Sequence, residues 1–100
     1  MGASAESDVD EDCKMNAEDL ENNVLQLIQI FINRLSESDV ESMRDLATHS
    51  ECGLAVEDLC VQLVERNAKI NQEEYSRVRT VATALDIDSS YWLGLKGIID

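Results

Sequence analysis

Residues 17–35 read AEDLENNVLQLIQIFINRL, and the apolar positions of this stretch decide the fold class. Apolar side chains recur at steps of three and four residues, at Leu20, Val24, Leu27, Ile28, Phe31 and Leu35. This period places them on one face of a helix over about residues 17–35. Further apolar residues widen that face: Leu25, Ile30 and Ile32. We therefore expect a long, deeply buried helix at the centre of the fold.

Helical spacing continues towards the middle of the chain. Residues 38–41 (SDVE) form a capping-box pattern, which predicts a second helix from Ser38 to about His49. The turn after it contains Gly53, which is free to take a positive φ. A third helix is then expected over about residues 54–67. Its core face consists of Val56, Leu59, Cys60 and Leu63.

Two more helix starts follow. Residues 71–74 (NQEE) predict an N-terminal cap and a helix that ends near Leu85. Asp88 or Ser89 then caps a short helix that contains Trp92. The chain has no proline, four glycines and no alternating apolar run, which disfavours strands. The sequence thus predicts an all-α fold, a compact bundle of four to five helices with a disordered acidic N-terminal tail.

The length of 100 residues fits one domain. Residues 1–15, MGASAESDVDEDCKM, are small and acidic with almost nothing to bury. Such a composition cannot offset the entropy of ordering the chain, so we expect a disordered tail there. Residues 16–100 are expected to form a single helical domain.

The charge of the chain excludes several classes of partner. Asp and Glu number 21 against 8 Lys and Arg, a formal net charge of -13. Contacts to nucleic-acid phosphates need a basic face, and an anionic membrane repels an acidic one, so we expect neither partner. A basic protein surface fits instead. Because no apolar run approaches the ~20 residues of a membrane span and the N-terminus lacks a basic, apolar leader pattern, we expect a cytoplasmic protein.

Catalytic and metal-binding patterns are absent from the sequence. His49 is the single histidine, and its place near a predicted helix C-terminus explains it without chemistry. Cys13, Cys52 and Cys60 are odd in number and lack the paired spacing of a zinc site. We therefore expect no catalytic residue, no cofactor and no metal, and we interpret the chain as a non-enzyme. A small hydrolase that depends on His49 remains the weakest alternative.

Acidic residues gather in one region of the predicted domain. Residues 37–65 hold eight acids against Arg44 alone, a net charge of -7, whereas residues 66–79 carry +2. Opposite the core face, the third predicted helix presents a mixed acidic and apolar set: Leu54, Glu57, Asp58, Val61 and Glu65. Acids around outward apolar residues resemble a contact patch with a charged rim. A second line of candidate partner-binding acids consists of Glu41, Asp45 and Glu51.

Each of these features also has a simpler structural interpretation. The acidic face fits an ordinary solvated surface equally well, because isolated exposed apolar residues such as these two are common. Tyr91 and Trp92 fit a lid over the core, with a partner anchor as the alternative. An amide stripe on the first helix is either a solvent face or a hydrogen-bonding surface; it contains Asn22, Gln26, Gln29 and Asn33.

Three blocks of the sequence resemble the MafI-like small immunity proteins. Residues 53–60 (GLAVEDLC) resemble the family's GLALE-LC helix, residues 71–75 (NQEEY) its S-x-E-E-Y helix start, and residues 85–92 (LDIDSSYW) its LGLDPSYW ending. The similarity spans about residues 35–99, and the order and spacing of the blocks are more distinctive than any one block. Asn71 replaces the usual Ser or Thr and Ser89 the usual Pro. Asn and Ser both keep the capping chemistry.

The resemblance implies a bacterial antitoxin for polymorphic or contact-dependent growth-inhibition toxins. Partners of such proteins include EndoU-type RNase domains, whose basic clefts an acidic protein could cover. The expected partner is therefore a cognate toxin nuclease domain. A helical adaptor or regulatory binding module without a toxin partner would share the same acidic composition, and the position of the gene after a large toxin-like reading frame would separate the two.

Overall fold

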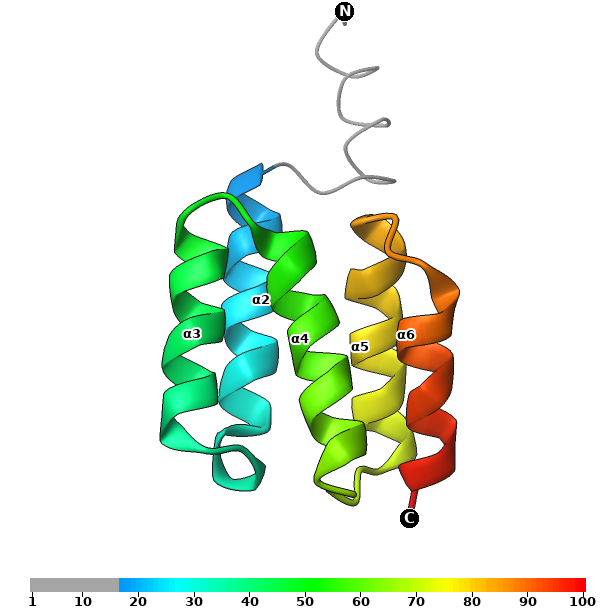
Figure 1. Ribbon diagram of the computed structural model, residues 1–100. Coiled ribbons are helices and arrows are strands. Elements are labelled where there is room, and N and C mark those ends of the chain that lie inside the picture. The colour runs from blue at the N-terminus through cyan, green and yellow to red at the C-terminus, as the bar shows by residue number, and fades with distance from the viewer. Residues whose placement is uncertain (1–16) are drawn as a thin grey trace, which may run out of the picture.

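The computed structural model describes residues 17–100, which form an all-α bundle (Figure 1). Its α-helices are α2 (Ala17–Ile30), α3 (Glu37–Thr48), α4 (Cys52–Glu65), α5 (Gln72–Ala84) and α6 (Ser89–Leu93). Two 3-10 helices follow α2 and α6, namely η1 (Ile32–Arg34) and η2 (Gly94–Ile98). The predicted fold class is confirmed. The tail predicted over residues 1–15 lies outside the described residues.

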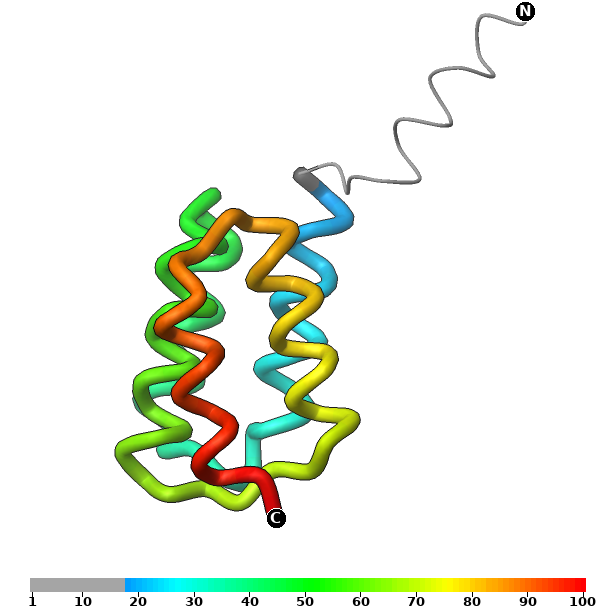
Figure 2. Tube along the Cα trace, turned by 90° about the vertical axis from the view of Figure 1, so that its right-hand side faces the viewer, coloured from blue at the N-terminus to red at the C-terminus, as the bar shows by residue number. Residues whose placement is uncertain are grey.

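Successive helices run in alternating directions, so that each pair forms an antiparallel hairpin (Figure 1). α4 is the central helix, because it packs against α2, α3, α5, α6 and η2, whereas α2 packs against α3, α4 and α5. α6 contacts α4 and α5, η2 contacts α4 and α6, and together they cover the side where α4 and α5 meet (Figure 2). A single bridge between Ile70 and Ile99 ties the end of η2 to the loop before α5.

The core follows the apolar periodicity of the sequence. Val24, Leu27 and Ile28 of α2, and Phe31 directly after it, are at most 2% exposed. The predicted core face of α4 is likewise fully buried, at Val56, Leu59, Cys60 and Leu63. Apolar residues buried this completely stabilise the fold by about 1.5–3 kcal/mol each. The expected burial of the apolar face of the first helix is confirmed. The expectations that this helix is central and continues to about Leu35 are wrong, because α4 contacts more elements and α2 ends at Ile30, where the 3-10 helix η1 follows.

Helix starts were only partly predicted. The Asn71 capping box is confirmed, because its side chain accepts from Glu74 N at 2.7 Å and Glu74 accepts from Asn71 N at 2.9 Å. The box predicted at Ser38 is wrong: Ser36 is the N-cap of α3 and accepts from Asp39 N at 3.1 Å. Two serines lie two residues apart in the sequence, and the one preceding the first helical residue caps the helix.

Helix ends use a device that the sequence analysis missed. Ser50, Asn67 and Asp86 have φ values of 65°, 49° and 59°, and each follows the end of a helix. The next amide in each case bonds back five residues, as Ala68 N does to Leu63 O at 3.0 Å. This is the left-handed helix end usually built on glycine. The positive φ expected at Gly53 is wrong, because Gly53 lies inside α4 and Ser50 makes the turn.

An ion pair joins η1 and α5 at one end of the bundle. Both terminal nitrogens of Arg34 donate to Glu74, at 2.8 and 2.7 Å, and one also donates to the carbonyl of Lys69. The guanidinium lies 5.0 Å from the centre of the Phe31 ring. These hydrogen bonds hold the pKa of Glu74 below its ordinary value, since they favour the charged carboxylate. We call this pair the Arg34–Glu74 clamp.

Candidate functional site

The outward face of α4 is the candidate site, and its position follows from helix geometry. Because one side of α4 is filled by core residues, residues about half a turn away must point to solvent. Leu54 and Val61 lie there with 50% and 37% of their surface exposed. The prediction that these two apolar residues point outward is confirmed.

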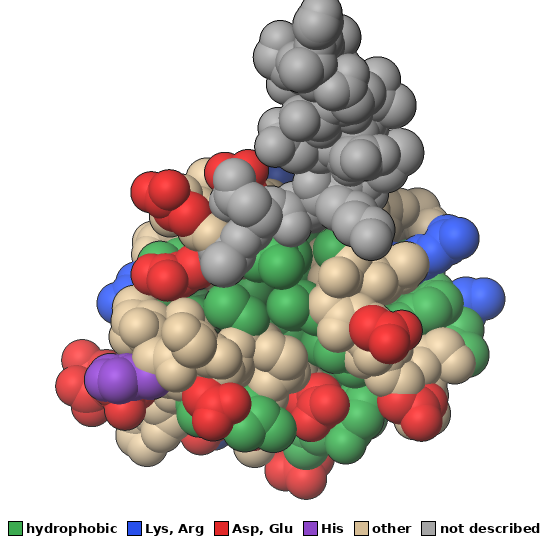
Figure 3. Space-filling view, turned by 90° about the horizontal axis from the view of Figure 1, so that it is seen from above, with side chains coloured by type: hydrophobic (Ala, Val, Ile, Leu, Met, Phe, Trp, Pro, Cys, Tyr) green, Lys and Arg blue, Asp and Glu red, His purple; other side chains and the backbone are tan. Residues whose placement is uncertain are grey.

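Three acids share this outward face. Glu57 and Asp58 are half-buried, and Glu65 is exposed. None of the three makes a hydrogen bond or an ion pair with the described part of the chain. Seen from above, apolar and acidic side chains lie next to one another along the side that faces the viewer in Figure 1 (lower edge of Figure 3). These three charges therefore form no hydrogen bond or ion pair that would hold the described fold together.

The second line of acids does not continue this face. On α3, Arg44 donates to Gln29 of α2 at 2.8 Å, whereas Asp39 accepts from Arg66, the C-cap residue of α4, at 3.1 Å. These contacts mark the two sides of α3. Glu41 and Asp45 share a shallow hollow with Arg44, and a second hollow joins Glu41 to Ile32 near α2. They lie on the α2 side and on the solvent side of α3, away from α4.

Glu51 occupies a third position. It is the N-cap residue of α4, but its side chain makes no capping hydrogen bond and is exposed. A carboxylate at a helix N-terminus is favoured by the helix dipole, so Glu51 has a local structural role. The eight predicted partner-binding residues thus separate into one contiguous α4 set, a distinct α3 set and one residue at the start of α4.

Two exposed apolar residues were missed. Val64 and Leu93 are 41% and 42% exposed, comparable to Leu54 and Val61. A signal for Val64 exists in the sequence, because it follows Val61 by three residues, one helical turn. Leu93 could not be assigned, since the side that α6 presents to solvent depends on how α6 packs.

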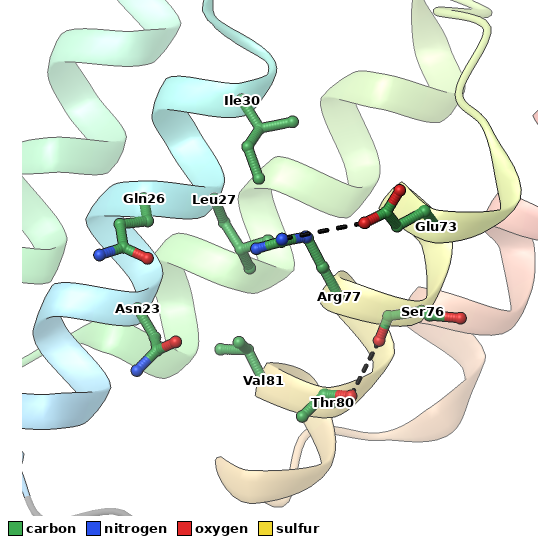
Figure 4. A pocket seen from close by; sticks show the side chains of 9 residues that line it. All are labelled: Asn23, Gln26, Leu27, Ile30, Glu73, Ser76, Arg77, Thr80 and Val81. Atoms are coloured by element: carbon green, nitrogen blue, oxygen red, sulfur yellow. Dashed lines mark hydrogen bonds and ion pairs between the residues drawn. The ribbon is translucent and has the colours of Figure 1, made fainter.

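A groove between α2 and α5 forms the main alternative surface (Figure 4). It measures about 340 Å³ and has an apolar floor that includes Leu27 and Val81. Arg77 reaches across it towards α2, and its nearest charged partner is Glu73 at 3.9 Å (Figure 4). One acid and one base line the groove, so it offers no net charge to a basic partner.

The amide stripe of α2 and η1 is one solvent face, as one of the two interpretations expects. Its four residues are all exposed: Asn22, Gln26, Gln29 and Asn33. The edges of the stripe meet the neighbouring helices, because Gln26 lines the α2–α5 groove and Gln29 accepts a hydrogen bond from Arg44 of α3.

Tyr91 and Trp92 pack as the lid interpretation expects. Both are half-buried, and the Trp92 ring lies 6.5 Å from that of Tyr75 on α5, centre to centre. Arg79 lies over the Trp92 ring at 5.7 Å. The indole is thus engaged by α5, which leaves little of it for a partner.

Reactive side chains do not converge among residues 17–100. His49 is exposed, and its Nδ1 lies 2.7 Å from the Asp45 carbonyl oxygen at the end of α3. Burial raises the pKa of Cys60 to about 12, which keeps its thiol protonated and unreactive. No group of three or more potential metal ligands occurs in this part of the chain, and none of its helices is long and apolar enough to cross a membrane.

Comparison with known proteins does not assign this chain to a family. None of the family models, curated proteins or solved structures compared with this chain matches it.

Proposed function

We propose that this chain is an immunity protein, a cytoplasmic non-enzyme that binds and neutralises a cognate bacterial toxin. The proposed partner is an EndoU-type RNase domain whose basic active-site cleft the acidic α4 face covers. One observation carries the proposal: Glu57, Asp58 and Glu65 have no partner in the described chain and surround exposed apolar side chains.

Carboxylates that make no contact within the fold are available to bind a partner. Carboxylates that held the fold would be paired or hydrogen-bonded, as Glu74 is. Unpaired carboxylates on one face create a local negative potential, which steers a basic partner and speeds association. Exposed apolar residues between them lose their water on contact and slow dissociation. Fast association and slow release are what neutralising a toxin requires.

The proposal predicts that a toxin-like reading frame lies directly upstream of the gene, and its test is co-expression of the chain with the C-terminal domain of that frame's product. A neighbouring frame of another kind would favour the adaptor alternative. We expect the two proteins to copurify and the chain to restore growth of cells that produce the domain. A Glu57→Lys/Asp58→Lys variant should lose both effects. The matched control is Glu37→Lys/Asp100→Lys, which changes net charge equally at exposed positions and should keep both. Copurification and rescue that fail for the wild-type chain would refute the proposal.

A further inference from the structure

Every large apolar side chain that is exposed among residues 17–100 lies on α4 or α6. These residues are Leu54, Val61, Val64 and Leu93, and together we call them the apolar strip. Scattered exposed apolar residues are ordinary on a soluble protein. Here they are gathered on two helices in contact with each other, while α2, α3 and α5 expose none. Such clustering marks a contact surface.

The packing of α6 explains why Leu93 joins this strip. Trp92 turns towards α5, where it contacts Tyr75 and Arg79. Leu95 is fully buried in the core. Gly94 turns towards α4, because a Cβ placed on it would lie 3.9 Å from Val64 Cγ2. The residues next to Leu93 thus face α5, the core and α4. The remaining side of α6 faces solvent, and Leu93 lies on it.

Gly94 also connects the two halves of the strip. Since it has no side chain, the backbone of η2 approaches Val64 without covering it, and Val64 stays 41% exposed. Val64 is therefore adjacent both to Val61, one turn earlier on α4, and to the residue that follows Leu93. The apolar surface runs from α4 onto α6, and the acids Glu57, Asp58 and Glu65 lie beside it on α4.

We propose that Val61, Val64 and Leu93 form the apolar centre of the toxin-docking surface, so that the toxin spans α4 and α6. This inference rests on the proposed function. The inference predicts the chemistry of the partner surface. An apolar residue of the toxin packs against Val64, and Lys or Arg side chains on either side of that residue contact the α4 acids. The arrangement of an apolar centre within a charged rim is the usual anatomy of a specific interface. The acids Glu41 and Asp45 lie outside this footprint.

The test compares a Val64→Thr/Leu93→Asn variant with the wild-type chain. The probe is the purified toxin domain from the co-expression test above, titrated calorimetrically at low and high salt and at several temperatures. We expect the dissociation constant to rise about tenfold or more. The increase should be the same at both salt concentrations, and the heat-capacity change on binding should become less negative, because less apolar surface is buried. Thr83→Ala/Ala84→Ser on the exposed side of α5 is the control and should bind as the wild type does.

The outcomes separate the two proposals. If the strip variant binds with the wild-type constant and heat capacity while Glu57→Lys/Asp58→Lys weakens binding, the strip is not the centre and the proposed function stands. If the wild-type chain does not bind the domain, the proposed function fails, and the assignment of the strip to a toxin fails with it. Thermal unfolding checks that the variants are folded. Should Val64→Thr/Leu93→Asn unfold, Val64→Ala and Leu93→Ala take its place in the same titration, with the same expected direction.

Discussion

The Arg34–Glu74 clamp and the outward face of α4 use charge in opposite ways. In the clamp, Glu74 accepts from Arg34 and from the backbone of Asn71, so its carboxylate serves the ion pair and the helix cap together. On α4, Glu57 and Asp58 are acids of the same chemistry with no hydrogen bond or ion pair to the described chain. The contrast separates charges that hold the fold from charges left for a partner. It also predicts that substitutions in the two regions change different properties.

The largest effect on stability is expected for Glu74→Ala, which affects both the ion pair with Arg34 and the cap of α5. Glu74→Ala removes the charge pair with Arg34 and one of the two capping-box hydrogen bonds of α5, the one from Asn71 N to the carboxylate, while the Asn71 side chain still caps the amide of residue 74. Charge-assisted hydrogen bonds contribute about 1.5–3 kcal/mol and the lost capping-box bond about 1 kcal/mol. We expect the free energy of unfolding to fall by about 3 kcal/mol in urea denaturation at neutral pH. A loss below about 0.5 kcal/mol, the level of ordinary surface substitutions, would show that the clamp is not structural.

A smaller loss is expected for Glu74→Gln, which separates the two functions. Glutamine also serves in a capping box, so the cap of α5 is kept and the charge pair with Arg34 is lost. Because Arg34 is about one-third exposed, solvent weakens the pair, and we expect a loss of about 1–2 kcal/mol. Urea denaturation beside Glu74→Ala gives the contribution of the cap by difference. Equal losses in the two variants would contradict a capping role.

The advantage of the wild type over Glu74→Gln should depend on pH. The folded pKa of Glu74 is lowered, chiefly by the Arg34 hydrogen bonds, so its contribution is complete above the unfolded pKa of about 4.5. It should be lost as pH falls through the lowered folded pKa. Denaturation curves of both proteins between pH 7 and pH 3 would show the difference shrinking only below the unfolded value. A difference that shrinks between pH 7 and pH 5 would point to another titrating group.

Charge reversal on α4 should change stability little. Glu57→Lys/Asp58→Lys breaks no hydrogen bond or ion pair and moves the net charge from -13 to -9, which lessens self-repulsion. We expect the free energy of unfolding to stay within about 0.5 kcal/mol of the wild type. Urea denaturation at neutral pH measures it. A loss of about 2 kcal/mol would mean that these acids hold the fold, and the contrast with the clamp would disappear.

Little change is expected in the chemistry of the inner face of α4 when its outer face is altered. Burial is the main cause of the raised pKa of Cys60 and the charge of Glu57 is the smaller one, so Glu57→Lys removes only the smaller cause. Cys60 is 1% exposed, and burial raises its pKa to about 12, so iodoacetamide at mildly alkaline pH should not label it in the folded protein. Mass spectrometry should find Cys60 equally protected in the wild type and in Glu57→Lys/Asp58→Lys. Rapid labelling in the variant would show that the two faces are coupled.

The fold could be predicted further than the site. Apolar periodicity identifies the buried faces of α2 and α4, because burial and helical spacing are properties of the local sequence. The Arg34–Glu74 clamp could not be predicted, since its partners lie 40 residues apart and meet only through packing. The left-handed ends at Ser50, Asn67 and Asp86 were missed because the pattern is read most readily from glycine.

The site divides in the same way. Leu54, Glu57, Asp58, Val61 and Glu65 were identified because one helix carries them all. The grouping of Glu41 and Asp45 with them was not supported, because adjacency along the sequence says little about which side of α3 faces α4. Leu93 depends on how α6 packs against α4 and α5, and only the structure shows it.

The salt dependence of toxin-domain binding tests the central claim most directly. We predict that the dissociation constant of the wild-type chain rises steeply with salt, because steering charges are screened over about 8–10 Å at moderate ionic strength. Glu57→Lys/Asp58→Lys should bind more than tenfold more weakly at low salt and show a shallower slope, while Glu37→Lys/Asp100→Lys keeps nearly the wild-type affinity and slope. Equal losses of affinity and slope in the two charge-reversal variants would show that net charge alone matters, and would contradict a docking site on α4.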